Sequence, residues 1–362
     1  MRFRIRGRIR CMGIKIKNAS SVTKEGIDFG VETASGRKDL RAVRYQDTAS
    51  SDRLVWERNS VIYDWNVVTI PESTTLAWQD IIYANNRFVA VGGTGMSSSA
   101  YVYRAMTSAD GTNWALHTAI PDCLWSSVAY GNNTFVAVAS SVAPSKNQNT
   151  VMTSLDGITW TSRSSNILCS SICYGNGLFV AVGGSGTSGV IQTSPNGINW
   201  TTRATSQSTG ANWYSVAYGN GLFCAVRGLG TNSSAIITSP DGITWTTRGG
   251  SDSSGRWETI TYGNGLFVAA GIGSSRVRTS PDGITWTTRT SASTATWTDI
   301  VWGNGLYVAV ARAGTDDRAM ISSNGIQWGK QTIPISNPWY GVAYGRNKFV
   351  AVGANRVMTF AI

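Results

Sequence analysis

The stretch Trp257–Arg289 reads WETITYGNGLFVAAGIGSSRVRTSPDGITWTTR, and variants of it recur along most of the chain. Successive copies begin about 40 to 47 residues apart, as from Trp257 to Trp297 and from Trp78 to Trp125. A repeat of this length is typical of propellers, solenoids and other arrays, in which each unit completes its core only against its neighbours. The repeat therefore constrains the architecture more strongly than the chain length of 362 residues does.

The composition agrees with a β-rich array. The chain has 40 Gly, 15 Trp and only 14% charged residues, and no long apolar stretch follows a period of 3.6. These features predict an all-β protein with many tight turns. Apolar runs such as Leu266–Gly271 are far shorter than the roughly 18 residues that a membrane span needs, so we expect a soluble chain. The arginine-rich start has no apolar core, which argues against a Sec signal peptide.

Each copy is predicted to form four antiparallel strands. It opens with Trp-x-x-apolar-x-Tyr, whose alternation is typical of a half-buried strand, and the Gly-Asn-Gly that follows predicts a hairpin. Leu-Phe-Val-Ala-Val then predicts a strand buried between two layers. A third strand ends at Thr-Ser, and a turn at Asp-Gly leads into Ile-Thr-Trp-Thr-Thr-Arg. Four antiparallel strands per copy make the blade of a β-propeller.

Counting the copies predicts seven blades and a closed ring. First strands are marked by Trp78, Trp125, Cys169, Trp213, Trp257, Trp297 and Trp339. Fourth strands are marked only by Trp114, Trp160, Trp200, Trp245, Trp286 and Trp328, because the last copy stops after its third strand. Val61–Ile70 resembles a fourth strand, so we expect it to complete the seventh blade, with Trp65 close to Val357 and Met358. The predicted fold is an all-β, seven-bladed propeller closed by an N-terminal strand and preceded by a small β anchoring segment.

The turn Thr-Ser-Pro-Asp-Gly-Ile-Thr-Trp, at Thr238–Trp245 and Thr279–Trp286, resembles the Asp box of sialidase-like and BNR-repeat propellers. The resemblance covers about residues 61 to 362 and implies the fold rather than an activity. The Asp or Asn of each turn is expected to hydrogen-bond its own backbone, at Asp110, Asp156, Asn196, Asp241, Asp282 and Asn324. One carboxylate per turn supplies too few oxygen ligands for a metal, so neither a metal nor a cofactor is expected.

Repeated tryptophans and cysteines are predicted to lie in the core. Nearly all tryptophans from Trp65 onward fall at repeat positions, which indicates packing between blades, with sugar stacking as the alternative. Cys169, Cys173 and Cys224 occupy positions that are apolar in other copies, so we expect inert core thiols.

Strand direction divides the propeller into two faces. The Gly-Asn and Asp-Gly turns must lie at one end of each blade because antiparallel strands alternate in direction. The longer and more variable connections lie at the other end, which favours that face for partner binding. Arg163, Arg203, Arg248 and Arg289 end fourth strands there and could form a basic rim for carboxylates or an acidic protein. Solvated strand-end charges are the alternative.

Three regions are predicted: a basic arm over residues 1–17, a small β attachment module over residues 18–60, and the propeller over residues 61–362. The arm alternates basic with apolar residues and carries Arg2, Arg4, Arg6, Arg8, Arg10, Lys15 and Lys17. Its arginines supply nearly half of the net charge of +11. We expect these cations to anchor the chain to an assembly. Nucleic-acid binding is a less favoured alternative, and Met12 is a second candidate for the natural start.

The segment from Tyr45 to Leu54-Val-Trp-Glu57 resembles the short N-terminal hairpin modules of bacteriophage tail and fibre proteins. Together with the YGNGLFVAVG and SPDGITW repeats, it makes the chain similar to predicted phage structural proteins. The resemblance implies a non-enzymatic virion component that is made in the host cytoplasm and present in multiple copies. Its implied partners are portal, collar, tail or capsid proteins and, through the propeller, a host-surface glycan or receptor.

Two other classes stay open, a glycan- or receptor-binding lectin or adhesin and a sialidase-like glycoside hydrolase. The resemblance to sialidases would imply an arginine triad, a Tyr nucleophile with a Glu partner and an acid-base Asp. Glu72 and Glu258 are the only glutamates from Val61 onward, and the sole histidine, His117, has no evident Ser or Cys partner. Paired carboxylates at Asp316 and Asp317 are the remaining hydrolytic candidate. We therefore expect no enzyme activity.

Overall fold

The computed structural model describes the propeller at residues 62–71, 76–94, 102–141, 149–165, 168–185, 188–203, 212–227, 236–248, 256–272, 276–314 and 318–362, and four short strands nearer the N-terminus. The chain divides into two compact units, Met1–Val61 and Ile62–Ile362. The boundary between the units falls one residue after the predicted one.

The first unit contains two short antiparallel pairs. β1 (Ile14–Ile16) pairs with β2 (Lys24–Gly26), and β3 (Arg44–Tyr45) pairs with β4 (Arg53–Leu54). β1 lies in the predicted arm and pairs with β2, which lies in the predicted attachment module. The boundary between arm and module at residue 17 stays a prediction. The side chains predicted to anchor the chain lie outside the described residues, namely those of Arg2, Arg4, Arg6, Arg8, Arg10, Lys15 and Lys17.

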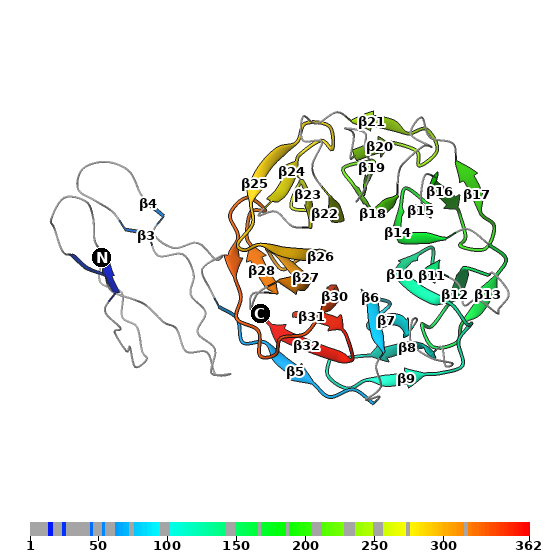
Figure 1. The fold of residues 1–362 in the computed structure, drawn as a ribbon, viewed down its shortest axis with the longest axis horizontal. Helices are drawn as coiled ribbons and strands as arrows, with labels where there is room; N and C mark the ends of the chain where they lie inside the picture. Colours follow the sequence, from blue (N-terminus) through cyan, green and yellow to red (C-terminus); the bar gives the residue numbers. More distant parts are fainter. Residues whose placement is uncertain are drawn as a thin grey trace. The chain divides into compact units, whose positions relative to one another are not determined.

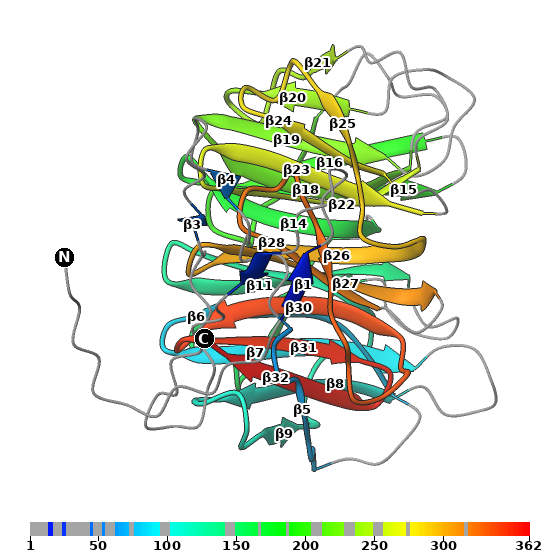
Figure 2. The same cartoon turned by 90° about the vertical axis from the view of Figure 1, so that its left-hand side faces the viewer.

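The second unit is a seven-bladed β-propeller, as the repeat count predicted (Figure 1). Each blade is a four-stranded antiparallel sheet, and the first strand of every blade lies nearest the central axis (Figure 1). Figure 2 shows the same propeller from the side, with the strands of the blades running between its two faces.

The strand bounds repeat closely from blade to blade. Blade 1 consists of β6 (Ala77–Ala84), β7 (Arg87–Thr94), β8 (Val102–Ser108) and β9 (Ala115–His117). Blade 2 consists of β10 (Leu124–Gly131), β11 (Thr134–Ser141), β12 (Val151–Ser154) and β13 (Thr161–Arg163). Blade 3 consists of β14 (Cys169–Gly175), β15 (Leu178–Ser185), β16 (Ser188–Ser194) and β17 (Thr201–Arg203). Blade 4 consists of β18 (Trp213–Gly219), β19 (Leu222–Arg227), β20 (Ile236–Ser239) and β21 (Thr246–Arg248).

The later blades keep the same order. Blade 5 consists of β22 (Trp257–Gly263), β23 (Leu266–Gly271), β24 (Arg276–Ser280) and β25 (Thr287–Thr290). Blade 6 consists of β26 (Ala295–Gly303), β27 (Leu306–Gly314), β28 (Ala319–Ser322) and β29 (Gly329–Lys330). Blade 7 consists of β30 (Trp339–Gly345), β31 (Lys348–Gly353), β32 (Arg356–Ala361) and β5 (Asn66–Val68).

The ring is closed by the predicted N-terminal strand. β5 pairs with β32 in antiparallel register, with Val68 opposite Val357 and Val67 opposite Met358. Trp65 packs edge-on against Phe360, with ring centroids 4.4 Å apart, and shares a buried cluster with Met358. The ladder is shorter than the predicted strand over Val61–Ile70. The closure itself is confirmed.

The Gly-Asn-Gly turn combines two different requirements. Its Asn and second Gly take the left-handed backbone of a tight hairpin, with φ of 48° at Asn176 and 76° at Gly177. Its first Gly serves packing between blades, because a Cβ added at Gly175 would collide with the ring of Tyr218 in the next blade. The same contact joins blade 7 to blade 1, where Gly345 faces Tyr83. The repeat sequence thus specifies both the hairpin and the approach of the neighbouring blade.

The core lies between adjacent blades. The first-strand tryptophans are 0 to 1% exposed, and the aromatic residue of each second strand is equally buried, a Phe in six blades and Tyr307 in blade 6. Cys169 replaces the Trp of blade 3 and is also buried, as is Cys224. Burial raises the pKa of the Cys169 thiol to about 12, so it stays protonated at neutral pH. The predicted packing roles of the tryptophans and of these two thiols are confirmed, and Cys173 is half-buried.

Candidate functional site

The two faces of the propeller differ in the contacts that their polar side chains make. First and third strands begin, and second and fourth strands end, at the face that carries the long connections, which we call the loop face. The hairpins and Asp-Gly turns lie at the opposite, tight-turn face. At the blade 1–blade 2 junction the Arg87 Nη1 from a hairpin donates to the backbone carbonyl of Asp156 in a turn, at 2.8 Å. The predicted division into two faces is therefore present.

On the tight-turn face, each turn residue binds its own backbone. In blade 4 the Asp241 Oδ1 accepts the N–H groups of Ile243 and Thr244, each at 2.8 Å, and the Ser239 hydroxyl, also at 2.8 Å. The Trp245 Nε1 then donates to the carbonyl of Gly242 at 3.0 Å. The same carboxylate or amide contacts recur in the other five turns. The turn-forming role is confirmed at Asp110, Asp156, Asn196, Asp241, Asp282 and Asn324.

These hydrogen bonds keep the turn carboxylates ionised. Donation from the Thr244 and Ile243 N–H groups lowers the pKa of Asp241 to about 2. Donation from the N–H groups of Thr285 and Ile284 does the same for the pKa of Asp282. Oxygen lone pairs of these carboxylates accept backbone N–H groups, so the carboxylates stabilise the turns.

The predicted rim arginines lie on the outermost strand of blades 2 to 5, each half-buried. In each blade the Nε donates to a Thr hydroxyl on the third strand, at 2.7 to 3.1 Å. The four residues are Arg163, Arg203, Arg248 and Arg289, and their partners are Thr153, Thr193, Thr238 and Thr279. The structure thus separates them by one blade each, at the circumference, and does not gather them around the axis. Their role as a partner-binding rim stays a prediction.

A second group of arginines lies closer to the axis and was missed from the sequence. The Glu258 side chain, 5% exposed, sits between Arg312, whose Nη1 is 2.8 Å away, and Arg256, whose Nε is 3.4 Å away. Both arginine side chains are 35% exposed. Arg256 directly precedes β22 and Arg312 lies near the end of β27, so the trio joins blades 5 and 6 at the loop face. No repeat position marks Arg312, because the other blades carry Gly, Ala, Ser or Ile there.

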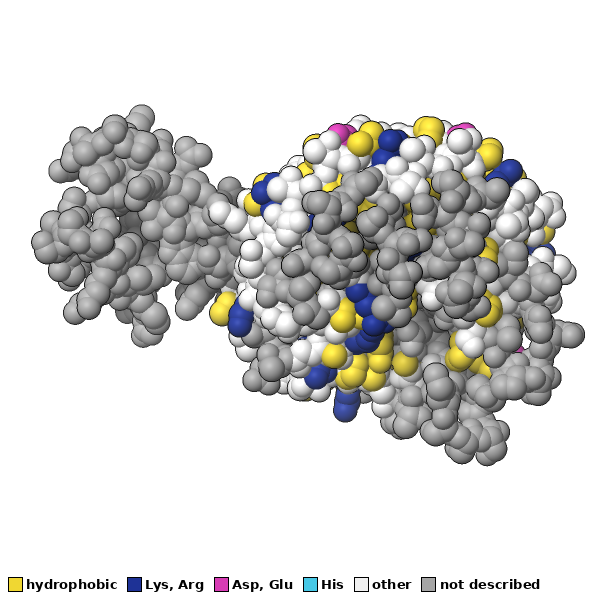
Figure 3. All heavy atoms as spheres, turned by 45° about the horizontal axis from the view of Figure 1, so that its top comes forward, with side chains coloured by type: hydrophobic (Ala, Val, Ile, Leu, Met, Phe, Trp, Pro, Cys, Tyr) yellow, Lys and Arg dark blue, Asp and Glu magenta, His cyan; other side chains and the backbone are white. Residues whose placement is uncertain are grey.

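The described part of the loop face carries a clear excess of positive charge. Partly exposed arginines occur at strand ends or next to them at Arg163, Arg203, Arg248, Arg256, Arg289, Arg312 and Arg318, whereas Arg227 is buried. The acids at corresponding places in the described residues are Asp122 and Glu258. Figure 3 shows Lys and Arg side chains gathered on the face that it displays, beside hydrophobic ones. A surface of this kind attracts negatively charged partners.

His117, the sole histidine, has a place in the repeat. It occupies the position that Arg163 takes in blade 2, and its Nε2 lies 2.9 Å from the Thr107 hydroxyl, just as the arginines bind their threonines. Burial lowers its pKa. In this contact the histidine ties the third strand to the fourth.

Two aspartates near the axis join blades. The Asp80 Oδ2 accepts the Val128 N–H at 2.8 Å across the blade 1–blade 2 junction, and the Asp299 Oδ2 accepts the Val342 N–H at 2.8 Å across the blade 6–blade 7 junction. At the same position, blades 2 to 4 use a serine hydroxyl for the same purpose, as Ser127 does. Burial raises the pKa of Asp80 to about 6, and burial together with the charge of Asp80 raises the pKa of Asp299 to about 7.

The described residues contain no group of three or more His, Cys, Asp or Glu arranged to hold a metal ion. They also contain no helix with the length and hydrophobicity that crossing a membrane requires.

No known protein family and no curated protein sequence matches the chain. Solved structures share its fold. The chain is similar to YCF48 bound to D1 peptide, at 14% identity over 84% of this chain and 97% of that one, with a TM-score of 0.62. It is also similar to virginiamycin B lyase from Staphylococcus aureus, at 11% identity over 83% and 99%, with a TM-score of 0.67. The WD40 β-propeller domain of Doa1 aligns at 12% identity over 82% and 97%, with a TM-score of 0.55. At these identities the likeness shows the β-propeller fold alone.

Proposed function

We propose that this chain is a non-enzymatic structural protein of a bacteriophage virion. In this proposal residues 1 to 60 attach it to the particle, and the propeller presents its loop face to a negatively charged partner on a neighbouring virion protein or on the host surface. The observation that carries the binding part is the excess of arginine on the described loop face. The virion part rests on the sequence resemblance of Tyr45–Glu57 and of the repeats to phage structural proteins.

The Arg256–Glu258–Arg312 trio supports binding at the loop face. One carboxylate lies between two guanidinium groups, so the local charge stays positive after the pairing. Guanidinium groups bind carboxylates in a planar, two-pronged geometry, which suits an acidic protein segment. The solved structure of YCF48 bound to D1 peptide concerns a distant relative in fold, and it illustrates that a propeller can hold a peptide.

The contacts of the titratable side chains favour binding over catalysis. His117 is bound to Thr107, Glu258 to two arginines, and the turn aspartates to their own backbone. Asp80 and Asp299 hold backbone N–H groups of the next blade. A general acid or base must be able to reach a substrate proton, whereas these groups are engaged in holding strands and blades together.

The binding part can be tested with poly-L-glutamate as the probe. Replacing Arg256 and Arg312 with Ser should weaken binding at least tenfold at low salt, and the difference should shrink as salt screens the charges. The matched control replaces Arg346 and Lys348, two cations of the tight-turn face, and should leave binding close to wild type. Equal weakening by both variants would mean that only net charge matters and would contradict a loop-face site.

The attachment part needs a separate experiment. A chain that lacks residues 1 to 60 should be absent from purified particles while its propeller folds normally, because the closing strand β5 is retained. Incorporation of the shortened chain at normal occupancy would contradict the proposal.

A further inference from the structure

Blade 1 departs from the repeat at one place on the tight-turn face. Blades 3 to 5 share a Leu after the hairpin, a Pro before the turn Asp or Asn, and a Thr after the fourth-strand Trp. Blade 1 has Arg87, Ala109 and Ala115 at these positions. It also has Thr112 where blades 2 to 6 expose an Ile, as at Ile243, which is 45% exposed. The Leu of blades 3 to 5 is thus replaced by the cation Arg87, and their Pro and Thr are replaced by the smaller Ala109 and Ala115.

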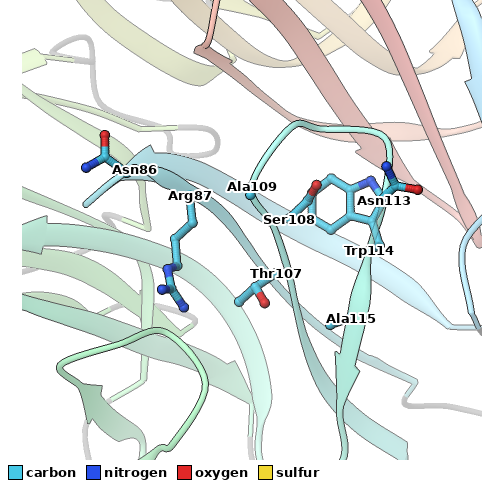
Figure 4. A pocket seen from close by; sticks show the side chains of 8 residues that line it. All are labelled: Asn86, Arg87, Thr107, Ser108, Ala109, Asn113, Trp114 and Ala115. Carbon is cyan, nitrogen blue, oxygen red and sulfur yellow. The ribbon is translucent and has the colours of Figure 1, made fainter.

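The shorter side chains leave a pocket. Its volume is about 400 Å³, and Figure 4 shows the side chains around it. Ala109 and Ala115 form part of the wall, so two of the replaced positions line the space directly. The indole of Trp114 forms another part of the wall, and Asn86, Arg87, Thr107 and Asn113 contribute polar groups. A pocket of this volume is of the size that holds a small ligand.

The polar groups of this pocket, which we call the blade 1 pocket, are held in place by the fold. Arg87 uses one N–H of its guanidinium on the Asp156 carbonyl, which leaves its other donors in a fixed position. The Asn113 Nδ2 donates to the Asp110 Oδ2 at 2.7 Å, so its amide plane is fixed as well. Thr107 is tied to His117. Amide, hydroxyl and guanidinium groups around one pocket supply both donors and acceptors.

The charge around the pocket favours a neutral ligand. The N–H groups of Asn113 and Thr112 lower the pKa of Asp110, so this carboxylate stays negative where its Oδ2 accepts the Asn113 amide of the pocket wall. A phosphate or carboxylate ligand bound to that amide would lie near this negative charge. A ligand rich in hydroxyl groups would not be repelled, and it can use the amide and guanidinium groups while an apolar edge lies against the exposed part of Trp114, a residue that is 8% exposed.

We propose that the blade 1 pocket binds one neutral saccharide residue of a glycan. The site lies on the face opposite the arginine-rich loop face, so it goes beyond the proposed function and stands or fails independently of it.

The repeat supplies variants that should fill the pocket without unfolding the chain. Ala109→Pro combined with Ala115→Thr restores the residues found at Pro240 and Thr246 of blade 4. Asn86→Gly and Arg87→Leu likewise restore Gly221 and Leu222. Because sibling blades fold with these residues, thermal unfolding of each variant should resemble that of the wild type.

Saturation-transfer NMR with free glucose, galactose, rhamnose and N-acetylglucosamine tests the proposal. At least one sugar should receive saturation from the wild-type chain, and the signal should fall at least tenfold in the A109P/A115T variant and at least threefold in N86G and R87L. The control P240A/T246A, which changes blade 4 instead, should keep the signal. No signal with any of the four sugars, or an equal signal from the filled variant, would overturn the site. The variant in which Arg256 and Arg312 are replaced by Ser should lose poly-L-glutamate binding and keep the sugar signal of the wild type.

Discussion

The tight-turn face and the loop face of this propeller use charge in opposite ways. On the tight-turn face, Asp241 and its equivalents are surrounded by N–H donors from their own turns, and the lowered pKa records how strongly the fold holds them. On the described loop face, arginines outnumber acids, and the Glu258 carboxylate is shared between two cations. One face uses its charges to hold the turns, and the described part of the other carries an excess of positive charge.

Recurring residues and departures from the repeat have different places in the blades. Residues that recur in most blades lie where the same contact is made again and again around the ring, as in the contact between a hairpin Gly and the Tyr or Trp of the next blade. Residues that break the repeat, such as Arg312 on one face and Ala109 on the other, mark places where one blade departs from its siblings.

The largest effect on stability is expected at a turn carboxylate. Asp241→Ala removes three hydrogen bonds and should lower the free energy of unfolding by about 2 kcal/mol, as measured by urea denaturation. Asp241→Asn is the matched control and should cost less than about 0.5 kcal/mol, because Asn196 makes the same contacts in blade 3. A full loss with Asn would show that the charge, rather than the hydrogen bonding, holds the turn.

Glu258→Gln should affect stability and binding in opposite directions. It leaves two partly buried guanidinium groups without their counter-ion, which should cost about 1 kcal/mol of unfolding free energy. It also raises the net positive charge of the loop face, so poly-L-glutamate should bind more tightly. Unchanged affinity, measured by fluorescence anisotropy at low salt, would count against this trio as part of the binding surface.

An effect that depends on pH is expected at the axis, between the two faces. The folded pKa values of about 6 at Asp80 and about 7 at Asp299 exceed the ordinary value of 3.8, so between about pH 4 and pH 7 the folded chain holds protons that the unfolded chain has released. Stability should therefore fall as the pH rises through this window. The double variant D80S/D299S, which copies the serines of blades 2 to 4, should flatten that slope in thermal melts at pH 5, 6, 7 and 8. An unchanged slope would place its origin in other groups.

The smallest change in stability is expected at the predicted rim. Arg203→Ser loses one hydrogen bond to the Thr193 hydroxyl at a half-buried position, which should cost about 0.5 kcal/mol. If the rim contributes to binding, the four-arginine variant should also weaken poly-L-glutamate binding in a salt-dependent way. If it does not, these residues only tie the fourth strand to the third, as His117 does in blade 1.

Most of the fold could be predicted because a repeat presents the same evidence of strand order in every copy. The Trp or Cys anchors of the first strands fixed the number of blades, and the missing fourth strand pointed to Trp65 and β5. The length of β5 could not be predicted, because pairing with Val357 and Met358 is a contact between distant parts of the chain that no local pattern limits.

The candidate sites were less predictable from the sequence. Arg163, Arg203, Arg248 and Arg289 recur and were therefore noticed, yet the structure separates them and ties each to a Thr. The Arg256–Glu258–Arg312 trio comes from two blades and depends on side-chain packing across the junction. The blade 1 pocket left a signal that could have been found, since Ala109 and Ala115 are small where blades 3 to 5 carry Pro and Thr. To detect that signal, the copies must be compared position by position, and the positions at which one copy differs matter more than those at which all agree.

The ring closure has a mechanical consequence. The polypeptide passes directly from the first unit into the short segment that leads to β5, and β5 is held to β32 through three facing residue pairs. Any tension applied at the amino-terminal unit is therefore transmitted first to the seam of the ring. Trp65, wedged against Phe360 just ahead of that seam, is placed to resist peeling before the first of those pairs is strained.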